Sequence, residues 1–397
     1  MLKNACPHLP VMAVVFAFLM SCATQSVGGG LDWGSGGGGC STESGGQIPS
    51  TLLDPPPAQV DEWGHFKTPM RIALSYYSNL VYVTDHNKNY VYVYDKNGKG
   101  IEILRGLSAP LGLAVYEPAL PEPEPVDCDI DTDRKKDKKK AKKKAKKKDK
   151  KKDKKKAFGK DDTGVDKLTK KDDSDGDVCT LPPPATPPQP VIYVANEGNG
   201  SVKIFNDVEV STLGSGVGEF SKPNGIAVTD EQTVYVVDSL TNQVKVYDAA
   251  GDLLFTFGSE GCGDGELDFP IDIAINEVLG EVYVTDYKNK RIVVFDLSGN
   301  WVSNIVTPLN DGGDPAYDRP SGLGIDAEGN LYVVDHILAS VVVISSTGTL
   351  LDIIGYSNQQ YWTGELASPS DAASDGQLIY VISSRDHSIK IFDGVLP

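Results

Sequence analysis

The sequence predicts an all-β, six-bladed β-propeller with four-stranded blades. The phrase Tyr-Val-x-Asp, with Asn or Ser as variants of the last residue, ends at Asp85, Asn196, Asp238, Asp286, Asp335 and Ser383. After a long gap the phrases lie 42 to 49 residues apart, a period typical of propeller repeats. Short apolar stretches surround each phrase, with Gly, Pro, Asn and Asp between them. A sheet with two apolar faces is stable only when it stacks on neighbours, and a ring of blades provides this.

Each predicted blade begins at a proline, and four strands follow it in order. The innermost strand follows the proline, as in 270–275, and the second contains the Tyr-Val phrase. The third ends in an aromatic or aliphatic residue, as in 291–296, and the fourth follows a glycine turn, as in 251–258. The six units start at Pro69, Pro110, Pro223, Pro270, Pro320 and Pro369. The innermost strands place a small residue at one equivalent position, as expected where blades converge: Ala73, Ala114, Ala227, Ala274, Gly324 and Ala373.

This frame resembles the NHL repeat. The stretch GSEGCGDGELDFP at 258–270 is similar to that family's linker between blades. The resemblance covers residues 50–397 outside one insertion, and it implies a six-bladed propeller. Because propellers host unrelated functions, it does not identify a ligand.

The last blade lacks its fourth strand, because the chain reaches Pro397 just after the third. The strand is therefore expected from the other end of the propeller, and 51–54 (TLLD) is the candidate segment. Closing the ring with strands from both ends removes an open edge that would otherwise invite aggregation.

Blade two contains a long insertion at 118–190, between the propeller segments 50–117 and 191–397. The net charge of the chain is −17, yet residues 127–177 hold 22 Lys and Arg against 14 Asp. Blocks of like charge usually remain disordered and serve as interaction tails. We expect this insertion to bind an anionic polymer or lipid by charge, or else to be a solvated spacer. No aromatic residue interleaves the lysines of 137–157, so specific nucleic-acid binding is not indicated.

Alternating aspartates flank the lysine-rich run and resemble the calcium loops of thrombospondin type-3 repeats. Carboxylates at alternate positions can converge on one Ca²⁺ where a glycine permits the turn. The alternative is that they offset the charge of the lysines, and the closing Glu of an EF-hand is absent. The candidate calcium ligands are Asp127, Asp129, Asp131, Asp133, Asp173, Asp175 and Asp177.

The first residues predict an export signal at 1–21. Their apolar run is too short to span a bilayer and suits a signal peptide. It ends in Leu-Met-Ser-Cys22, which resembles the bacterial lipobox and implies a lipid on Cys22. Because Ala23 follows, outer-membrane sorting is expected, and the Gly/Ser-rich stretch 22–49 is a tether. The alternative is an ordinary cleaved signal with a chance cysteine.

Four cysteines remain after removal of the leader and lipidation of Cys22, and export favours disulfides. Four cysteines allow three pairings. Cys128 and Cys179 bracket the insertion, so their pairing is expected, which leaves Cys40 for Cys262.

The candidate ligand site is a charged trio at the channel mouth. Two residues after each blade's proline the chain has Gly in three blades, and Arg71, Asp272 and Asp371 in the others. These side chains either bind a small polar ligand or a cation, or form a salt-bridged lid. The loops containing His86 and His336 are expected to lie away from the axis as surface turns, too far apart to share a zinc ion.

These observations predict an exported, lipid-anchored scaffold that binds a protein or glycan at the cell envelope. No catalytic residues are assigned. The alternative is a propeller hydrolase or lyase with a metal at the channel mouth, which would require convergent acid/base or metal-binding groups there.

Overall fold

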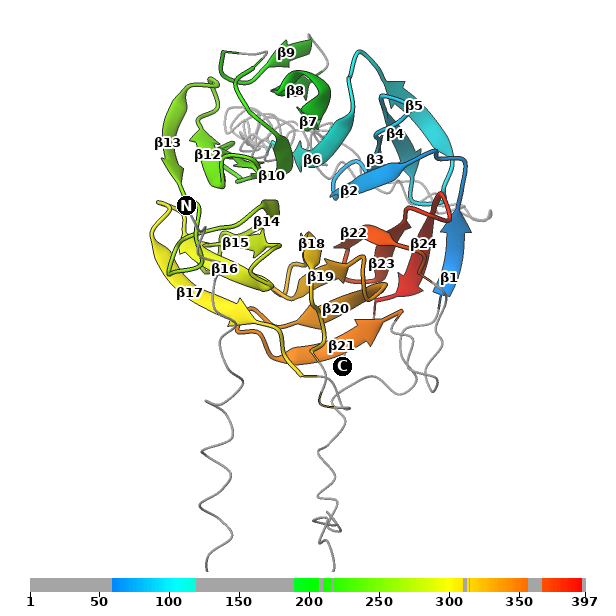
Figure 1. Ribbon diagram of the computed structural model, residues 1–397. Coiled ribbons are helices and arrows are strands. Elements are labelled where there is room, and N and C mark those ends of the chain that lie inside the picture. Colours follow the sequence, from blue (N-terminus) through cyan, green and yellow to red (C-terminus); the bar gives the residue numbers. More distant parts are fainter. Residues whose placement is uncertain are drawn as a thin grey trace, which may run out of the picture. The chain divides into compact units, whose positions relative to one another are not determined.

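The computed structural model describes residues 59–118, 189–206, 210–215, 218–309, 313, 315–355 and 366–394. These residues form six four-stranded sheets arranged as blades around one axis (Figure 1). The predicted all-β, six-bladed propeller is therefore confirmed. Residues 119–187 are assigned to a separate unit, and the predicted insertion lies outside the described residues apart from its ends.

Every innermost strand begins at the predicted proline. Blades 1 and 2 contain β2 (Pro69–Ser75), β3 (Leu80–Asp85), β4 (Tyr90–Asp95), β5 (Gly100–Leu104), β6 (Pro110–Tyr116), β7 (Val191–Asn196), β8 (Ser201–Phe205) and β9 (Val210–Thr212). Blades 3 and 4 contain β10 (Pro223–Val228), β11 (Val234–Asp238), β12 (Gln243–Tyr247), β13 (Leu253–Phe257), β14 (Pro270–Asn276), β15 (Glu281–Asp286), β16 (Arg291–Asp296) and β17 (Trp301–Val306). Blades 5 and 6 contain β18 (Pro320–Ile325), β19 (Leu331–Asp335), β20 (Ser340–Ile344), β21 (Leu350–Ile354), β22 (Pro369–Ser374), β23 (Leu378–Ser383), β24 (Ser388–Asp393) and β1 (Gln59–Trp63).

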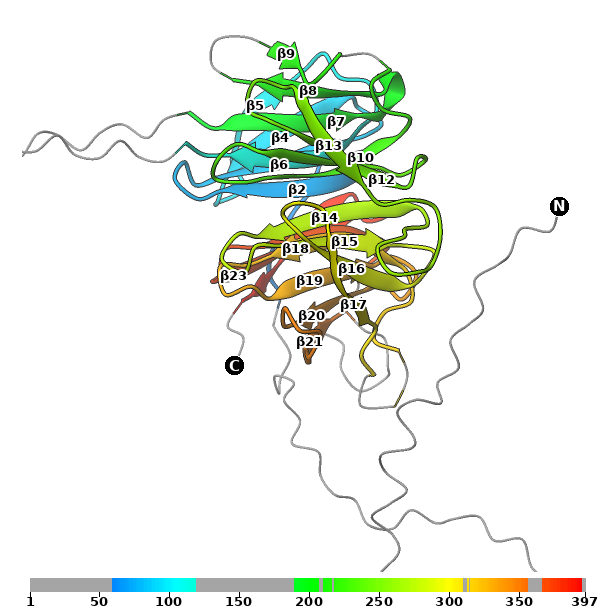
Figure 2. The same cartoon turned by 90° about the vertical axis from the view of Figure 1, so that its left-hand side faces the viewer.

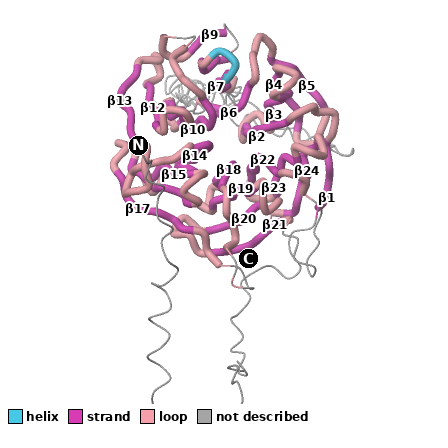
Figure 3. The backbone as a smooth tube through the Cα atoms, viewed as in Figure 1, coloured by secondary structure: helices cyan, strands magenta, loops and turns pink. Residues whose placement is uncertain are grey.

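Helix is nearly absent from the described residues. A short 3₁₀ turn, η2 (Glu197–Asn199), follows β7 and is drawn in cyan in Figure 3. No helix in the described part of the chain has the length and apolar character needed to cross a membrane.

The apolar core is divided among the six interfaces between adjacent blades. Each interface has its own cluster of buried residues, such as Val244, Leu267 and Phe295 between blades 3 and 4. The remaining five clusters join the other neighbouring pairs. Figure 2 shows the sheets stacked edge-on. Both faces of each sheet are thus buried, as the apolar patterning of the strands predicts.

Small residues on the innermost strands lie opposite tyrosines of the second strands. Ala73 pairs with Tyr82, and Ala274 with Tyr283; the other four blades repeat this pairing. A Cβ atom at Gly324 would overlap the carbonyl oxygen of Ala372 in the next blade. The expected requirement for small side chains at these positions is therefore a packing requirement between blades.

The ring closes through an N-terminal strand, as expected, but the predicted segment was wrong. The fourth strand of blade 6 is β1, which pairs antiparallel with β24 and brings Trp63 opposite Ile389. Trp63 is buried, and its ring centroid lies 5.9 Å from those of both Tyr94 and Tyr380. The segment 51–54 lies outside the described residues. The apolar composition of 51–54 is typical of a strand, whereas β1 is largely polar and contributes Trp63 to the cluster between blades 6 and 1.

The polar residue that ends each second strand, which is Asp in four blades, Asn196 in blade 2 and Ser383 in blade 6, accepts hydrogen bonds from the backbone of the segment that enters the same blade. Asp85 accepts hydrogen bonds from the backbone N–H groups of Lys67 (2.7 Å) and Thr68 (3.1 Å). Asp335 accepts from Asp318 and Arg319, both at 2.6 Å. These residues therefore have a structural role, and Asp85 and Asp335 also accept from the backbone of the turn that follows each strand.

Candidate functional site

Two cavities lie along the propeller axis, one on each side of Arg71. The larger has a volume of about 500 Å³ and is lined by residues at the beginnings of the innermost strands, including Thr68 and Met70. The smaller, of about 140 Å³, is lined by later residues of the same strands, including Leu74 and Ser374. Arg71 lines both, so its side chain separates them. We call the larger one the mouth cavity.

Two sets of repeat positions line the mouth cavity. The first is the residue immediately after each blade's proline: Met70, Leu111, Asn224, Ile271, Ser321 and Ser370. The second comes from the loops after the second strands: His86, Glu197, His336 and Ser384. The expectation that the loops of His86 and His336 lie away from the axis was therefore wrong. Strand patterning places a loop at the end of a strand but does not show how near it lies to the axis.

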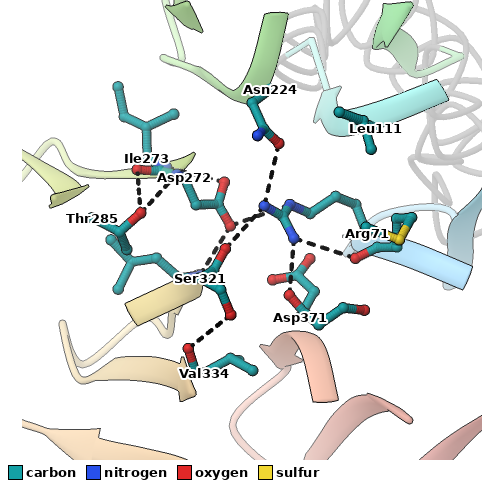
Figure 4. A network of polar contacts seen from close by, with 12 residues as sticks. Arg71, Leu111, Asn224, Asp272, Ile273, Thr285, Ser321, Val334 and Asp371 are labelled. Atoms are coloured by element: carbon teal, nitrogen blue, oxygen red, sulfur yellow. Dashed lines mark hydrogen bonds and ion pairs between the residues drawn. The ribbon is translucent and has the colours of Figure 1, made fainter. Parts of the chain in front are cut away.

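Arg71 is the centre of the polar network that closes the axis (Figure 4). Its Nη1 donates to the carbonyl oxygens of Ser370 (2.8 Å) and Met70 (3.3 Å). Its Nη2 donates to the Ser321 carbonyl (3.0 Å) and to Asn224 Oδ1 (3.5 Å), and Nε lies 3.4 Å from Asp272 Oδ2. The guanidinium thus links five of the six blades: Nη1 and Nη2 donate hydrogen bonds, whereas Nε has only its ion pair with Asp272.

The two aspartates of the predicted trio lie beside Arg71 and are bonded to neighbouring blades. Asp272 Oδ2 accepts from Leu323 N, and Asp371 Oδ2 accepts from Ile72 N, both at 2.9 Å. Burial raises the pKa of both carboxyls and Arg71 opposes this; the pKa of Asp371, raised also by the charge of Asp272, reaches about 7. The cluster therefore contains two buried carboxyl groups for one guanidinium.

The glycines at the equivalent positions make room for this cluster. A Cβ at Gly225 would lie 2.5 Å from Asp272 Oδ1, and one at Gly322 would lie 3.0 Å from Asp371 Oδ1. Three glycines and three charged residues thus fill one layer of the axis. This arrangement has the geometry of a salt-bridged floor beneath the mouth, because Arg71 is buried, pairs with Asp272 and donates to carbonyl oxygens of Ser321 and Ser370.

The polar side chains of that floor are also bonded within the protein. Ser384 Oγ donates to the Pro69 carbonyl (2.7 Å), and Ser321 Oγ donates to the Val334 carbonyl (3.2 Å). Asn224 Nδ2 donates to Ser239 Oγ at 3.3 Å.

Charged groups remain at the rim of the mouth cavity. Glu197 lies between two partners: its Oε2 is 3.3 Å from His86 Nε2, and its Oε1 is 3.1 Å from Lys222 Nζ. The exposed fraction of the side chain is 30 % for His86, 28 % for Glu197 and 29 % for Lys222. Lys222 Nζ also lies 5.8 Å from the ring centroid of Phe269. This rim can both donate and accept hydrogen bonds.

The opposite side of the rim is aromatic. The His336 ring stacks on Tyr287, with centroids 5.9 Å apart and planes inclined by 10°. Burial lowers the pKa of His336, which favours the neutral imidazole. Phe269 and His336 both line the mouth cavity.

The other predicted sites cannot be placed. Cys22, Cys128, Cys179 and the seven candidate calcium ligands lie outside the described residues. Cys262 is disulfide-bonded, and its partner also lies outside them. Within the described ranges, no group of three or more His, Cys, Asp or Glu side chains could hold a metal ion.

Comparisons with known proteins agree with the repeat pattern. A family described as a 6-bladed β-propeller matches residues 217–311. Protein brain tumor of Drosophila melanogaster is 26% identical over 141 residues, which are 35% of this chain and 13% of that protein. NHL repeat-containing protein 3 of Mus musculus is 29% identical over 135 residues, which are 30% of this chain and 39% of that protein. The chain thus covers less than half the length of these relatives, which are NHL-repeat homologues.

Two solved structures are similar to this chain at low sequence identity. A streptogramin B lyase has a TM-score of 0.48 and 11% identity, over 84% of this chain and 86% of that chain. A virginiamycin B lyase from Staphylococcus aureus has a TM-score of 0.47 and 12% identity, over 81% of each chain.

Proposed function

We propose that this NHL-type six-bladed propeller is a binding scaffold whose mouth cavity receives a ligand or partner group with one apolar and one polar end. The observation that supports this is a cavity of about 500 Å³ with an internally bonded floor and a charged rim. Its volume lies within the range of about 300–1,000 Å³ that is usual for ligand pockets.

The floor favours an apolar group. Met70, Leu111 and Ile271 line it, and the polar groups between them already have partners inside the protein. A ligand therefore gains little by hydrogen bonding there, whereas covering apolar surface contributes about 25 cal/mol per Å².

The rim favours a polar group. Lys222 and His86 both contact Glu197, so a ligand can accept from the first two or donate to the third. At pH 7 the charges of Lys222 and Glu197 balance, so hydrogen bonding is favoured over net charge as the basis of recognition. A polypeptide side chain and a glycan with an apolar substituent both have this chemistry.

A thermal-shift screen tests the proposal. The probes are blocked aromatic amino acids, which represent a protein partner, and alkyl or aryl glycosides, which represent a glycan. A probe that binds the mouth cavity should raise the melting temperature of the full chain. Phe269→Ala or Lys222→Ala should weaken the affinity for the probe about tenfold, equivalent to about 1.4 kcal/mol. The control Lys99→Ala alters an exposed hairpin residue and should bind as the wild type does. Equal binding by all variants would place the site elsewhere.

We further propose that residues 127–177 bind anionic polymers or lipids through their lysines. Tyr116 of β6 pairs directly with Val191 of β7, so a short turn can join these strands in place of residues 118–189, and Glu117 keeps its bonds to Tyr76 N and Tyr77 N. Shortening a loop changes the closure cost by only about 0.6 kcal/mol per twofold change in length. The propeller is therefore expected to stay folded.

Replacing residues 118–189 by a Gly-Ser turn should remove binding to vesicles that contain phosphatidylserine. Binding of the full chain should fall steeply between about 50 and 200 mM salt, because screening weakens exposed charges. The control replaces the same segment by a Gly-Ser linker of equal length. Vesicle binding that survives both replacements would place the anionic contact on the propeller.

A lipid on Cys22 would place this scaffold at the cell envelope, with the outer membrane as its expected site. This anchor, calcium on the acidic flanks and the Cys128–Cys179 bond remain predictions. The alternative is a metal-dependent hydrolase or lyase. The described part of the mouth contains no group of three or more His, Cys, Asp or Glu side chains that could hold its metal.

A further inference from the structure

The seam where the ring closes, between blades 1 and 6, is joined at the axis as well as by β1. Arg71 Nη1 donates to Ser370 O (2.8 Å), and Ile72 N donates to Asp371 Oδ2 (2.9 Å). Ser384 Oγ also donates to Pro69 O at 2.7 Å. Figure 1 shows β2 and β22 side by side at this seam, and their residues make many contacts. The first two bonds involve the axial cluster, so the state of that cluster affects the seam directly.

The charge of the cluster is not balanced when both carboxyl groups are ionised. Arg71, Asp272 and Asp371 are each only 5 % exposed. Arg71 and Asp272 are the charged groups that act on Asp371. The neighbouring strands β10 and β18 present uncharged Asn224 and Ser321 to the cluster.

The charged or titratable residues on the other strands packed against β22 have partners outside the cluster. Asp335 on β19 accepts from the backbone of Asp318 and Arg319. Tyr380 on β23 packs against Trp63 instead. Ionising Asp371 thus adds a second buried negative charge that the same guanidinium must offset.

We propose that the Arg71–Asp272–Asp371 cluster is a pH-sensitive latch on the seam between blades 1 and 6, which holds most firmly when Asp371 is protonated. The raised pKa of Asp371, about 7, sets the pH range. A carboxyl whose folded pKa exceeds its unfolded value of about 3.9 stabilises the fold fully below that value and loses the contribution as pH rises. The stabilising contribution of this group is therefore lost progressively as pH rises from about 4 towards the folded pKa of Asp371.

Hydrogen exchange of the full chain at pH 5 and pH 8, corrected for intrinsic rates, tests the latch. Protection of β2 and β22, including the amide of Ile72, should fall more between these pH values than protection of β10–β12 in blade 3. This comparison needs no variant. Equal falls in both regions would overturn the proposal.

Asp371→Asn provides the second measurement, because the amide oxygen can still accept from Ile72 N. This variant should abolish the extra loss of protection at the seam. Asp352→Asn is the matched control: Asp352 on β21 is 2 % exposed, its pKa is raised by burial to about 6, and it lies away from the seam. It should alter overall pH dependence and leave the seam-specific loss intact. A seam response that persists in Asp371→Asn, or disappears in Asp352→Asn, would contradict the assignment.

Discussion

Arg71→Met is expected to destabilise the propeller by about 3–5 kcal/mol at pH 8, because it leaves two buried carboxyl groups without their cation. The same change removes the donors that hold the carbonyl groups of Ser370 and Ser321. Urea unfolding of the full chain, followed by tryptophan fluorescence, measures the loss.

The control for this prediction removes the charges together. In Arg71→Met/Asp272→Asn/Asp371→Asn no unpaired charge remains, so a large part of the lost stability should return. Buried ion pairs replaced as a unit often cost little, whereas removing one partner is expensive. A loss below about 1 kcal/mol in the single variant would show that Arg71 does not stabilise the axis.

Deleting residues 59–63 is expected to have a comparable or larger effect. It removes the backbone pairing of β1 with β24, at about 1 kcal/mol per hydrogen bond. It also removes Trp63, and truncating a buried tryptophan typically costs about 3–5 kcal/mol. The total approaches the whole stability of many domains, about 5–15 kcal/mol. The remaining chain should expose β24 as an open edge and aggregate on heating.

Deleting residues 51–54 instead is the matched control. This segment was the closing strand expected from sequence, and its removal should leave the melting temperature unchanged. Trp63→Ala should fall between the two deletions, because the backbone pairing of β1 remains. Equal losses from both deletions would mean that the segment before β1 also supports the closure.

The charged trio of the candidate site was predicted from sequence in its members but not in its role. Counting two residues from each blade's proline brought Arg71, Asp272 and Asp371 together, and the structure places them within one layer. The count did not distinguish a ligand site from a closed floor. That depended on which carbonyl oxygens lie near the guanidinium, and Ser321 and Ser370 are separated from Arg71 by 250 and 299 residues.

The mouth cavity was missed although its signal was present. The residue after each proline lines the cavity in all six blades, and a second alignment of the repeats at that position would have found the set. The rim contacts of Glu197 with His86 and Lys222 were less accessible, because they join three blades through loops of unequal sequence.

The sequence by itself determined the number of blades, the start of each innermost strand and the position of its small residue. These features follow from local strand patterning repeated six times, and one repeat predicts the next. The tertiary structure alone decided which segment closes the ring, which loops cover the mouth and whether Arg71 is free. Each of these depends on how close residues far apart in the chain come when the blades pack, and the gap that Trp63 fills exists only after blades 1 and 6 meet.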